Sequence, residues 1–381
     1  MSKRLRSEEL AALVERVFQP AADEKRLAIL VDLPDARVVD NADWRRRREI
    51  ALGWLEELSG QESVLGIKPT LALYRNAHTN NGDLPESCWI YTGGTLPENA
   101  DALDPAQAIP FARLFADNPL LLCPTQFSAT APLKLLSKKY PIRAATMSGF
   151  CEGMIPALRI DYTEVNRRVN YLKDKLDRAT RADFVFTRPG GESHLHLDLR
   201  FREAHSSGGL LPKPGAGNLP SGEAYIVPFE GETEPSRSAG VLPVQFGEEI
   251  VLYRIESNKA VEVLTQGTVS AQEAEKLREE PAYGNIAELG LGVLAAFGIK
   301  PVGKVLLDEK LGAHIAFGRS DHFGGQVGPK DFSSPDTVIH IDRVYVSDMQ
   351  PNVAVKRLDL IMGDGSSLAL MRDGGYVVDF N

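Results

Sequence analysis

The second half of this chain carries acidic residues and histidines inside short, strand-like apolar runs. The six residues are Glu223, Glu288, Glu309, His314, His340 and Asp342. Carboxylate oxygens and imidazole nitrogens are common protein ligands of divalent metal ions. Three acids and two histidines could therefore coordinate metal, and the remaining acid could transfer a proton. A dinuclear metal hydrolase requires this set of residue types.

His340 and Asp342 lie two residues apart in the run Val-Ile-His-Ile-Asp-Arg-Val, which predicts a strand. Side chains two positions apart project from the same face of a strand, so one imidazole nitrogen and one carboxylate oxygen would be presented together. A buried hydrogen bond between the histidine and the aspartate, without any metal, fits the same pattern equally well. The pair alone therefore leaves both interpretations open.

The other candidates lie beside glycine and apolar residues. Glu288 is enclosed by Asn-Ile-Ala and Leu-Gly, and Glu223 by Pro-Ser-Gly and Ala-Tyr. Burying a carboxylate in such surroundings without a cation is costly, so each acid needs a partner. His314 lies in Gly-Ala-His-Ile-Ala-Phe-Gly, where the glycines allow close backbone approach. Glu309, five residues upstream of His314, could serve as the general base.

Between residues 27 and 187 the chain alternates between short β-rich runs and longer amphipathic stretches. The expected strands span 27–33, 70–74, 120–123 and 183–187. The expected helices span 46–58, 110–116, 132–138 and 162–179. This alternation predicts an α/β domain whose mostly parallel sheet is covered by helices on both faces. No glycine-rich phosphate-binding motif follows any of these runs, so nothing indicates a dinucleotide or a nucleoside triphosphate.

A segment rich in glycine, proline and serine, residues 206–222, predicts a loop or a domain boundary. Beyond it the pattern is β-rich, with strands expected at 224–229, 249–255, 260–265, 338–346, 358–362 and 376–380. One helix, 271–279, is expected to follow Ser270 as its N-cap. We therefore predict an α/β domain over residues 1–214 and an α+β domain over residues 215–381 that contains the metal site.

The composition limits the class of protein. The chain has 381 residues and is 43% hydrophobic, which suits two cores, because single cores stop growing near ~250–300 residues. Its net charge of −9 argues against a nucleic acid or an anionic membrane as the main partner. No run of ~18 apolar residues occurs and the charged start has no signal-peptide core, so we expect a soluble cytoplasmic protein. Three separated cysteines without a Cys-x-x-Cys pair indicate neither a disulfide framework nor a thiolate zinc site.

Four segments resemble, in order and approximate spacing, motifs of the aminopeptidase S/T (thermophilic) family of metallopeptidases. They read Gly-Glu-Ala-Tyr-Ile-Val-Pro, Asn-Ile-Ala-Glu-Leu-Gly, Asp-Glu-Lys followed by His-Ile-Ala-Phe-Gly, and His-Ile-Asp. Successive candidate ligands in them are separated by 65, 26, 26 and 2 residues. The resemblance extends more weakly through the first half, in segments such as RAATMSGF, and so covers most of the chain.

The resemblance implies a two-metal aminopeptidase that acts on small peptides or amides. It places the metal ligands at Glu223, Glu288, His314, His340 and Asp342. Within that set Glu288 would bridge the ions, and Glu309 would be the catalytic acid/base that takes a proton from water. The resemblance also implies a homodimer whose cavity admits only short substrates. Ligands of these types suit zinc, cobalt and manganese alike, so the metal is not specified.

Two features depart from the family pattern. Family aminopeptidases carry a tyrosine seven residues after the histidine that matches His314, a group that could steady an oxyanion. This chain has Asp321 there, followed by His322, and we treat both as candidate catalytic residues. The loop before His314 reads Gly-Ala, where relatives with the Asp-Glu-Lys form often show Gly-Thr and one further residue, so we expect a shorter loop.

Two alternatives to the hydrolase stay open. Relatives with the Asp-Glu-Lys form include ring-opening dioxygenases of dihydroxypyridines, which use one ferrous ion. In that case His314, His340 and Asp342 would supply a two-histidine, one-carboxylate triad, and His322 a proton relay. The additional acids Glu223 and Glu288 favour the hydrolase, because extra anionic ligands stabilise a second divalent ion. The other alternative is a paralogue that binds peptides or amino-acid-derived ligands without turnover, supported by the altered tyrosine position.

Overall fold

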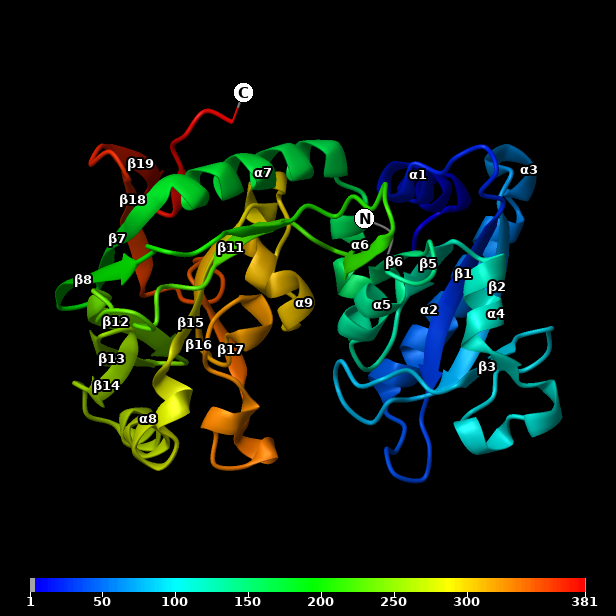
Figure 1. The fold of residues 1–381 in the computed structure, drawn as a ribbon, viewed down its shortest axis with the longest axis horizontal. Coiled ribbons are helices and arrows are strands. Elements are labelled where there is room, and N and C mark those ends of the chain that lie inside the picture. The colour runs from blue at the N-terminus through cyan, green and yellow to red at the C-terminus, as the bar shows by residue number, and fades with distance from the viewer. Residues whose placement is uncertain (1–3, 381) are drawn as a thin grey trace. The chain divides into compact units, whose positions relative to one another are not determined.

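The structure is a computed structural model that describes residues 4–380 (Figure 1). It has a mixed α/β fold with several sheets, divided into two compact units. The first unit comprises the chain up to Asn166 together with Gly209–Ser221, and the second comprises Arg167–Gly208 together with the chain from Gly222 onward. The chain therefore passes between the units three times rather than once near residue 214, because residues 179–198 pair with strands of the second unit.

A seven-stranded sheet forms the first unit, in the order β10-β6-β5-β1-β2-β3-β4. Five neighbouring strands are parallel: β10 (Gly215–Asn218), β6 (Arg143–Thr146), β5 (Leu120–Cys123), β1 (Arg26–Leu33) and β2 (Lys68–Arg75). The antiparallel strands are β3 (Ser87–Ile90) and β4 (Ile109–Pro110). The helices are α1 (Ser7–Phe18), α2 (Ala42–Ser59), α3 (Glu62–Leu65), α4 (Phe111–Asp117), α5 (Thr130–Leu136) and α6 (Ile155–Leu158). The expected alternation of strands and helices is thus present.

The sheet of the first unit is buried because its central strands are continuously apolar. β1 reads Arg-Leu-Ala-Ile-Leu-Val-Asp-Leu, and every residue after the first is buried. Phe111 and Phe115 of α4 and Leu133 of α5 pack in one core with Ala28 and Leu30 of β1. Strands covered on both faces read as such unbroken runs, which explains why the sequence indicates a parallel sheet.

Asp32, near the carboxyl end of β1, occupies the place where parallel sheets commonly bind a ligand. Its carboxylate accepts hydrogen bonds from the backbone amides of Gln126 and Phe127, at 2.7 and 3.0 Å, and from the Trp44 indole at 3.1 Å. The loop amides that could hold a phosphate are therefore bound by the protein's own carboxylate. This agrees with the lack of a glycine-rich phosphate-binding motif.

The glycine-rich segment expected to be a loop contains a strand. Residues 215–218 form β10, which pairs in parallel with β6 at the edge of the sheet. Glycine weakens strands because it has no side chain to pack, so sequence pattern alone does not indicate one here. The prediction of a loop throughout residues 206–222 is therefore wrong at these positions.

The second unit contains two antiparallel sheets (Figure 1). The eight-stranded sheet runs in the order β14 (Lys259–Val263), β13 (Glu249–Glu256), β12 (Ala239–Phe246), β8 (Gly191–Asp198), β7 (Ala179–Arg188), β18 (Ala354–Met362), β19 (Ser367–Arg372), β20 (Gly375–Tyr376). The five-stranded sheet runs in the order β17 (His340–Val344), β16 (Ala313–Gly318), β15 (Ile286–Gly292), β11 (Glu223–Ile226), β9 (His205–Ser207). Its helices are α8 (Thr268–Glu279), α9 (Val305–Asp308) and most of α7 (Tyr162–Arg178), whose residues up to Asn166 belong to the first unit.

Aromatic side chains join the two sheets of the second unit. Phe317 of β16 contacts Tyr253 of β13, with ring centroids 5.1 Å apart, and Tyr345, just after β17, contacts Phe186 of β7 at 4.8 Å. Phe317 is three residues from His314, and successive residues of a strand face opposite sides, so these two side chains lie on opposite faces. One face of the five-stranded sheet is thus packed on its neighbour, and His314 lies on the other.

Helix α8 begins differently from the sequence prediction. It starts at Thr268, and Ser270 lies inside its first turn. The carboxylate of Glu249, from β13, accepts hydrogen bonds from the amides of Val269 at 3.0 Å and Ser270 at 2.6 Å. A side chain distant in sequence therefore performs the capping that we assigned to Ser270.

Two further findings concern the described chain. No helix within residues 4–380 has the length and apolar character needed to cross a membrane. The three cysteines are free, and Cys88 and Cys123 are buried. Burial raises the pKa of the Cys88 thiol to about 12, so this thiol stays protonated at neutral pH.

Candidate metal centre

One face of the five-stranded sheet collects the five candidate ligands. Residues directly opposed in an antiparallel pair point to the same face. Ala316, two positions after His314 on β16, opposes Glu288 on one side and Asp342 on the other. This surface, called the ligand face below, carries Glu223, Glu288, His314, His340 and Asp342.

Two glycines of β15 make room on the ligand face. Gly290 opposes His314, and a Cβ atom at residue 290 would lie 1.9 Å from the His314 Nε2. Gly292 opposes Glu223, and a Cβ atom there would lie 2.3 Å from the backbone carbonyl carbon of Lys310. Both contacts are too short for any side chain, so the positions of His314 and Lys310 require glycine on β15.

We expect Gly290→Ala to displace the His314 imidazole and to lower metal content by at least half after identical loading. The check is elemental analysis of the full chain, with thermal unfolding to verify folding. Gly53→Ala, in α2, is the matched control, because a Cβ atom at residue 53 meets nothing within 4 Å. Full metal occupancy in Gly290→Ala would show that His314 is not a ligand in its present position.

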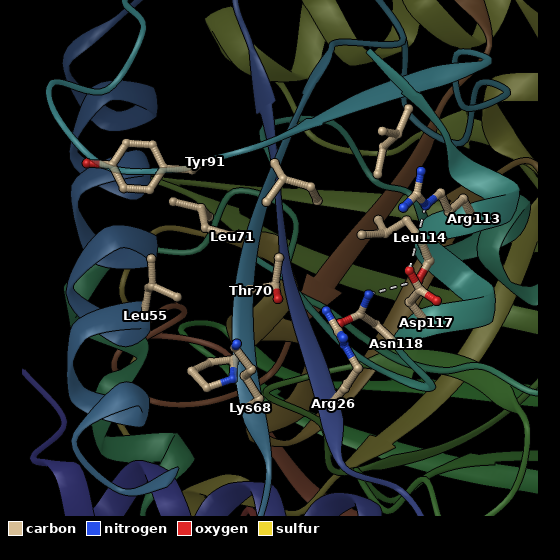
Figure 2. Close-up of a pocket in the computed structure, with 13 residues that line it drawn as sticks. Arg26, Leu55, Lys68, Thr70, Leu71, Tyr91, Arg113, Leu114, Asp117 and Asn118 are labelled. Carbon is tan, nitrogen blue, oxygen red and sulfur yellow. Dashed lines mark hydrogen bonds and ion pairs between the residues drawn. The ribbon is translucent and has the colours of Figure 1, made fainter. Parts of the chain in front are cut away.

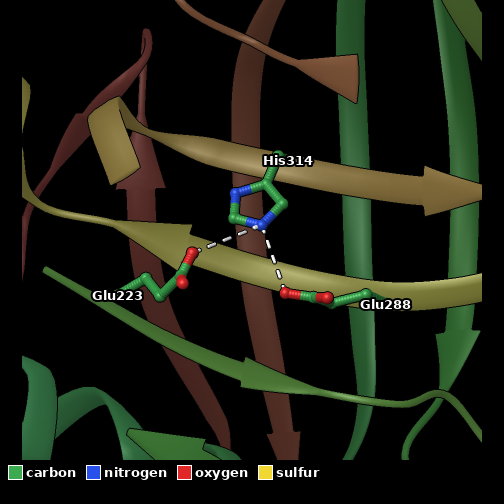
Figure 3. Close-up of side chains that lie close together, drawn as sticks. All are labelled: Glu223, Glu288 and His314. Carbon is green, nitrogen blue, oxygen red and sulfur yellow. Dashed lines mark hydrogen bonds and ion pairs between the residues drawn. The ribbon is translucent and has the colours of Figure 1, made fainter. Parts of the chain in front are cut away.

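The first group of ligand atoms comes from three strands. Figure 3 shows the His314 imidazole with its Nε2 facing both Glu223 and Glu288. The Nε2 atom lies 3.3 Å from Glu288 Oε1 and 3.7 Å from Glu223 Oε2. All three side chains are buried, and their ligand atoms lie within 4.8 Å of one another. A single ion could therefore contact all three.

The second group shares Glu288 with the first. His340 Nε2 lies 3.2 Å from Glu288 Oε2 and 3.5 Å from Asp342 Oδ1. The atoms of Glu288, His340 and Asp342 also lie within 4.8 Å of one another. One oxygen of Glu288 thus faces His314 and the other faces His340, which is the arrangement expected of a carboxylate that bridges two ions.

The two histidines are oriented as metal ligands. His314 Nδ1 donates to the Gly312 carbonyl at 3.3 Å, and His340 Nδ1 donates to the Arg319 carbonyl at 2.8 Å. A neutral imidazole with its proton on Nδ1 presents a lone pair on Nε2. That lone pair would face carboxylate oxygens, which is repulsive unless a cation lies between them. Backbone hydrogen bonds of this kind commonly fix the tautomer of ligating histidines.

The pKa values of His314 and Glu288 show how these groups compensate one another's charge when no metal is bound. Burial opposes charge on His314, but the hydrogen bond to Glu288 and the charges of Asp342, Glu288 and Glu223 raise its pKa to about 10. Burial also opposes charge on Glu288, yet its hydrogen bonds from His314 and His340 leave its pKa below the usual value. Protons on the imidazoles thus compensate the acids, as divalent cations would. The residues present fit a metal site.

A buried lysine, which the sequence did not single out, lies beside the ligands. The Lys310 Nζ is 3.0 Å from Glu223 Oε1 and also contacts Glu309 Oε1, and its side chain is fully buried. Burial would lower the pKa of Lys310, but the charges of Glu223 and Glu309 raise it above its usual value. In the sequence this lysine follows Asp-Glu, a pattern typical of a solvated turn. Only its contact with Glu223, which is distant in the chain, shows that it belongs to the cluster.

Glu309 is held at this cluster by its neighbour Lys310. Burial, together with the charges of Glu223 and Asp342, raises the pKa of Glu309 to about 8, although Lys310 opposes the shift. A carboxyl group whose pKa lies near neutrality can both accept and return a proton. Glu309 therefore stays a candidate acid/base group at this cluster.

Asp321 and His322 lie 3.6 Å apart, from Oδ1 to Nδ1, but they differ in their contact with the candidate ligands. Asp321 pairs with Arg319, and this guanidinium lowers the pKa of Asp321 against the effect of burial. Among residues 4–380, Asp321 makes no ion pair with the five candidate ligands. The His322 ring lies 5.4 Å from the His340 ring, and burial with the charges of His340 and Arg319 lowers its pKa to about 4. Only His322 of the two thus adjoins the ligands.

A cavity elsewhere in the fold contains none of these residues. It measures about 420 Å³ and lies in the first unit, where Figure 2 shows Arg26, Lys68 and Arg113 on its lining. The chemistry-bearing groups of the ligand face lie in the second unit. We therefore place the candidate site by the side-chain cluster rather than by this cavity.

Comparison with known proteins identifies a fold. No family model and no curated protein matches the chain. The 2,5-dihydroxypyridine dioxygenase from Pseudomonas putida KT2440 is 16% identical, with a TM-score of 0.60, over 100% of this chain and 99% of that chain. Wild-type AmpT from Thermus thermophilus is 18% identical, with a TM-score of 0.53, over 98% of this chain and 99% of that chain. The chain thus shares its fold with both of these proteins over nearly its whole length.

Proposed function

We propose that the protein is a two-metal, aminopeptidase-type hydrolase of small peptides or amides. The observation that carries the proposal is the sharing of Glu288 between two ligand groups, one oxygen facing each histidine. Glu223, His314 and Glu288 would hold one ion, and Glu288, His340 and Asp342 the other. Divalent ions bound there would polarise a substrate carbonyl and lower the pKa of water.

The charges of the cluster support two ions rather than none. The cluster holds four carboxylates, those of Glu223, Glu288, Glu309 and Asp342, and the buried ammonium of Lys310 pairs with two of them, Glu223 and Glu309. Glu223 Oε2 is buried and, within the described chain, has no hydrogen-bond partner. Uncompensated buried charge is strongly unfavourable. Divalent ions would offset this negative charge in place of the imidazole protons, and one of them would satisfy this oxygen.

The protein's own residues would then perform the proton transfers. Glu309 would accept a proton from the attacking water and return it to the leaving amine. Lys310 would keep the Glu309 carboxylate directed at the ligand face through their ion pair. His314 is buried and the Glu309 side chain is 17% exposed, so bulk water would have little access to the reacting centre.

A ring-opening dioxygenase is the second candidate, favoured by one specific observation. Lys310 binds Glu223 Oε1, so this carboxylate is already partly neutralised and has one oxygen left for metal. His314 Nε2 and His340 Nε2 lie 3.9 and 3.5 Å from Asp342 Oδ1, which suits a two-histidine, one-carboxylate site for a single ferrous ion. The likeness to the dihydroxypyridine dioxygenase supports the fold for this chemistry, and the likeness to the aminopeptidase AmpT supports it equally for hydrolysis.

Metal content distinguishes these proposals. We would purify the full chain without chelator, under reducing and oxygen-free conditions, and measure metal per chain by elemental analysis. We expect about two equivalents of zinc, cobalt or manganese and hydrolysis of aminoacyl p-nitroanilides. One equivalent of iron with oxygen uptake on a dihydroxypyridine would replace the hydrolase by the dioxygenase. No bound metal after reconstitution would overturn both.

A further inference from the structure

Aromatic rings border the ligand face at its His340 side. Phe323 lies with its ring centroid 4.8 Å from Tyr225 and 5.5 Å from His340, and His322 lies 3.8 Å from Phe323. The contacts of Tyr225 and His340 with Phe323 are edge-to-face, at 60° and 76°. We call the surface formed by Tyr225, His322 and Phe323 the aromatic wall.

Tyr225 belongs to the ligand face by its position on β11. It is two residues after Glu223 and opposes Gly290, which itself opposes His314. A tyrosine hydroxyl carries its proton at neutral pH and can donate a hydrogen bond. Within residues 4–380 the hydroxyl has no hydrogen-bond partner. A donor without a partner beside the ligands is available to a substrate.

Phe323 is only partly buried, although its backbone is firmly held. His205, paired in register with Tyr225, donates from Nε2 to the Phe323 carbonyl at 3.1 Å. Glu230 accepts hydrogen bonds from Ser320 Oγ at 2.6 Å and from the amide of Gln326, on either side of Phe323. A residue that served only to fill the core would be fully enclosed. Phe323 is instead half-buried, with its ring beside that of His340.

We infer that the aromatic wall is the specificity surface for the substrate side chain next to the reacting bond. The inference rests on the proposed hydrolase. A flat or bulky apolar group would pack on Phe323 and Tyr225, since rings prefer offset or edge-to-face contacts at these spacings. The Tyr225 hydroxyl would donate to a substrate oxygen. The substrate class is therefore peptides or amides whose reacting residue carries an aromatic or large aliphatic side chain.

The test compares full-length, metal-loaded wild type and variants on the p-nitroanilides of L-phenylalanine, L-leucine and L-alanine. We expect wild type to favour phenylalanine over alanine by ~10–100-fold in kcat/KM, the range that apolar pockets supply. Phe323→Ala should remove this preference, mainly through KM for the phenylalanine substrate. Tyr225→Phe should lower kcat/KM for all three substrates by ~3–10-fold, as for a lost hydrogen bond, and keep the preference.

Two controls separate specificity from folding. Phe201→Ala removes a phenylalanine of the same unit that is 69% exposed, and it should leave the preference unchanged. Metal content should equal that of wild type in every variant, because none of the altered side chains is a candidate ligand. Hydrolysis with no preference for large side chains, or a preference that survives Phe323→Ala, would overturn the inference.

A binding measurement tests the aromatic wall independently of whether the protein is a hydrolase. Titration calorimetry would compare free L-phenylalanine and L-alanine on metal-loaded wild type and Phe323→Ala. One outcome is that no substrate is hydrolysed, but L-phenylalanine binds wild type at least tenfold more tightly than L-alanine does and loses this advantage in Phe323→Ala. This would support the aromatic wall and overturn the proposed hydrolase. Equal binding of both amino acids to wild type would overturn the wall itself.

Discussion

Glu309→Gln should lower kcat by ~10²–10⁴-fold, the contribution of a positioned acid/base group, while both metal ions remain bound. Glutamine keeps the size of the side chain and an oxygen that can accept from Lys310, but it cannot take a proton. The position of Glu309, in contact with Lys310 and with a pKa raised by burial to about 8, makes it the proton acceptor in the proposed reaction. Steady-state kinetics and elemental analysis on the same samples provide the measurement.

The stability of this variant serves as its control. In the metal-free folded protein, Glu309 keeps its proton up to about pH 8, whereas the ordinary value is 4.5. Between these pH values the unfolded chain binds fewer protons, so stability falls as the pH rises. Glutamine carries no such penalty, and metal-free Glu309→Gln should therefore melt no lower than wild type at pH 7. Turnover within tenfold of wild type, with two metals present, would rule out the acid/base role.

The sequence predicted the first unit well because its strands are buried on both faces. The run that forms β5, residues 120–123, was predicted with its observed bounds, and that of β1 within one residue. Buried parallel strands need apolar residues at every position, and this pattern is legible in a single sequence. The edge strand β10 was not predicted, because it consists of small residues and is held by backbone pairing with β6.

The division into units could not be read in the same way. Residues 179–198 form β7 and β8, and these strands pair with β18 and β12 of the second unit. Such pairing depends on residues far apart in the chain, which neither composition nor local periodicity reports. The composition change near residue 214 marks a real segment between the units, but not the only one.

The candidate ligands were accessible from sequence, whereas their surroundings were not. Acids and histidines at strand spacing are recognisable individually, and the structure brings the five together on one face. Gly290 looks unfavourable for a strand, yet its missing side chain is what admits His314. Lys310 and Tyr225 were not singled out from the sequence, because each lies beside the candidate ligands only through contacts with residues on other segments. Asp321 was included through its place in the chain, and its partner is Arg319.

Glu288→Ala should remove both metal ions, lowering bound metal from two equivalents to none under conditions that saturate wild type. Its two oxygens face His314 and His340 at 3.3 and 3.2 Å, so the substitution removes a ligand from both groups at once. Even a residue that only supports a ligand typically contributes ~10–100-fold to metal affinity. Loss of a shared ligand should exceed that for each ion. Elemental analysis and calorimetric metal titration measure the effect.

Glu223 and Asp342, which each belong to one ligand group only, provide the comparison that tests whether Glu288 bridges two ions. Glu223→Ala and Asp342→Ala each alter one group only, so each should retain about one equivalent of metal. Glu256→Ala, at a side chain that is 57% exposed, should retain two. Metal-loaded wild type should also gain thermal stability over the metal-free form, since a ligand at 100 times its Kd adds ~2.7 kcal/mol, and Glu288→Ala should lose this gain. One tightly held ion in Glu288→Ala would mean that Glu288 does not bridge, and would favour the single-ion triad of His314, His340 and Asp342.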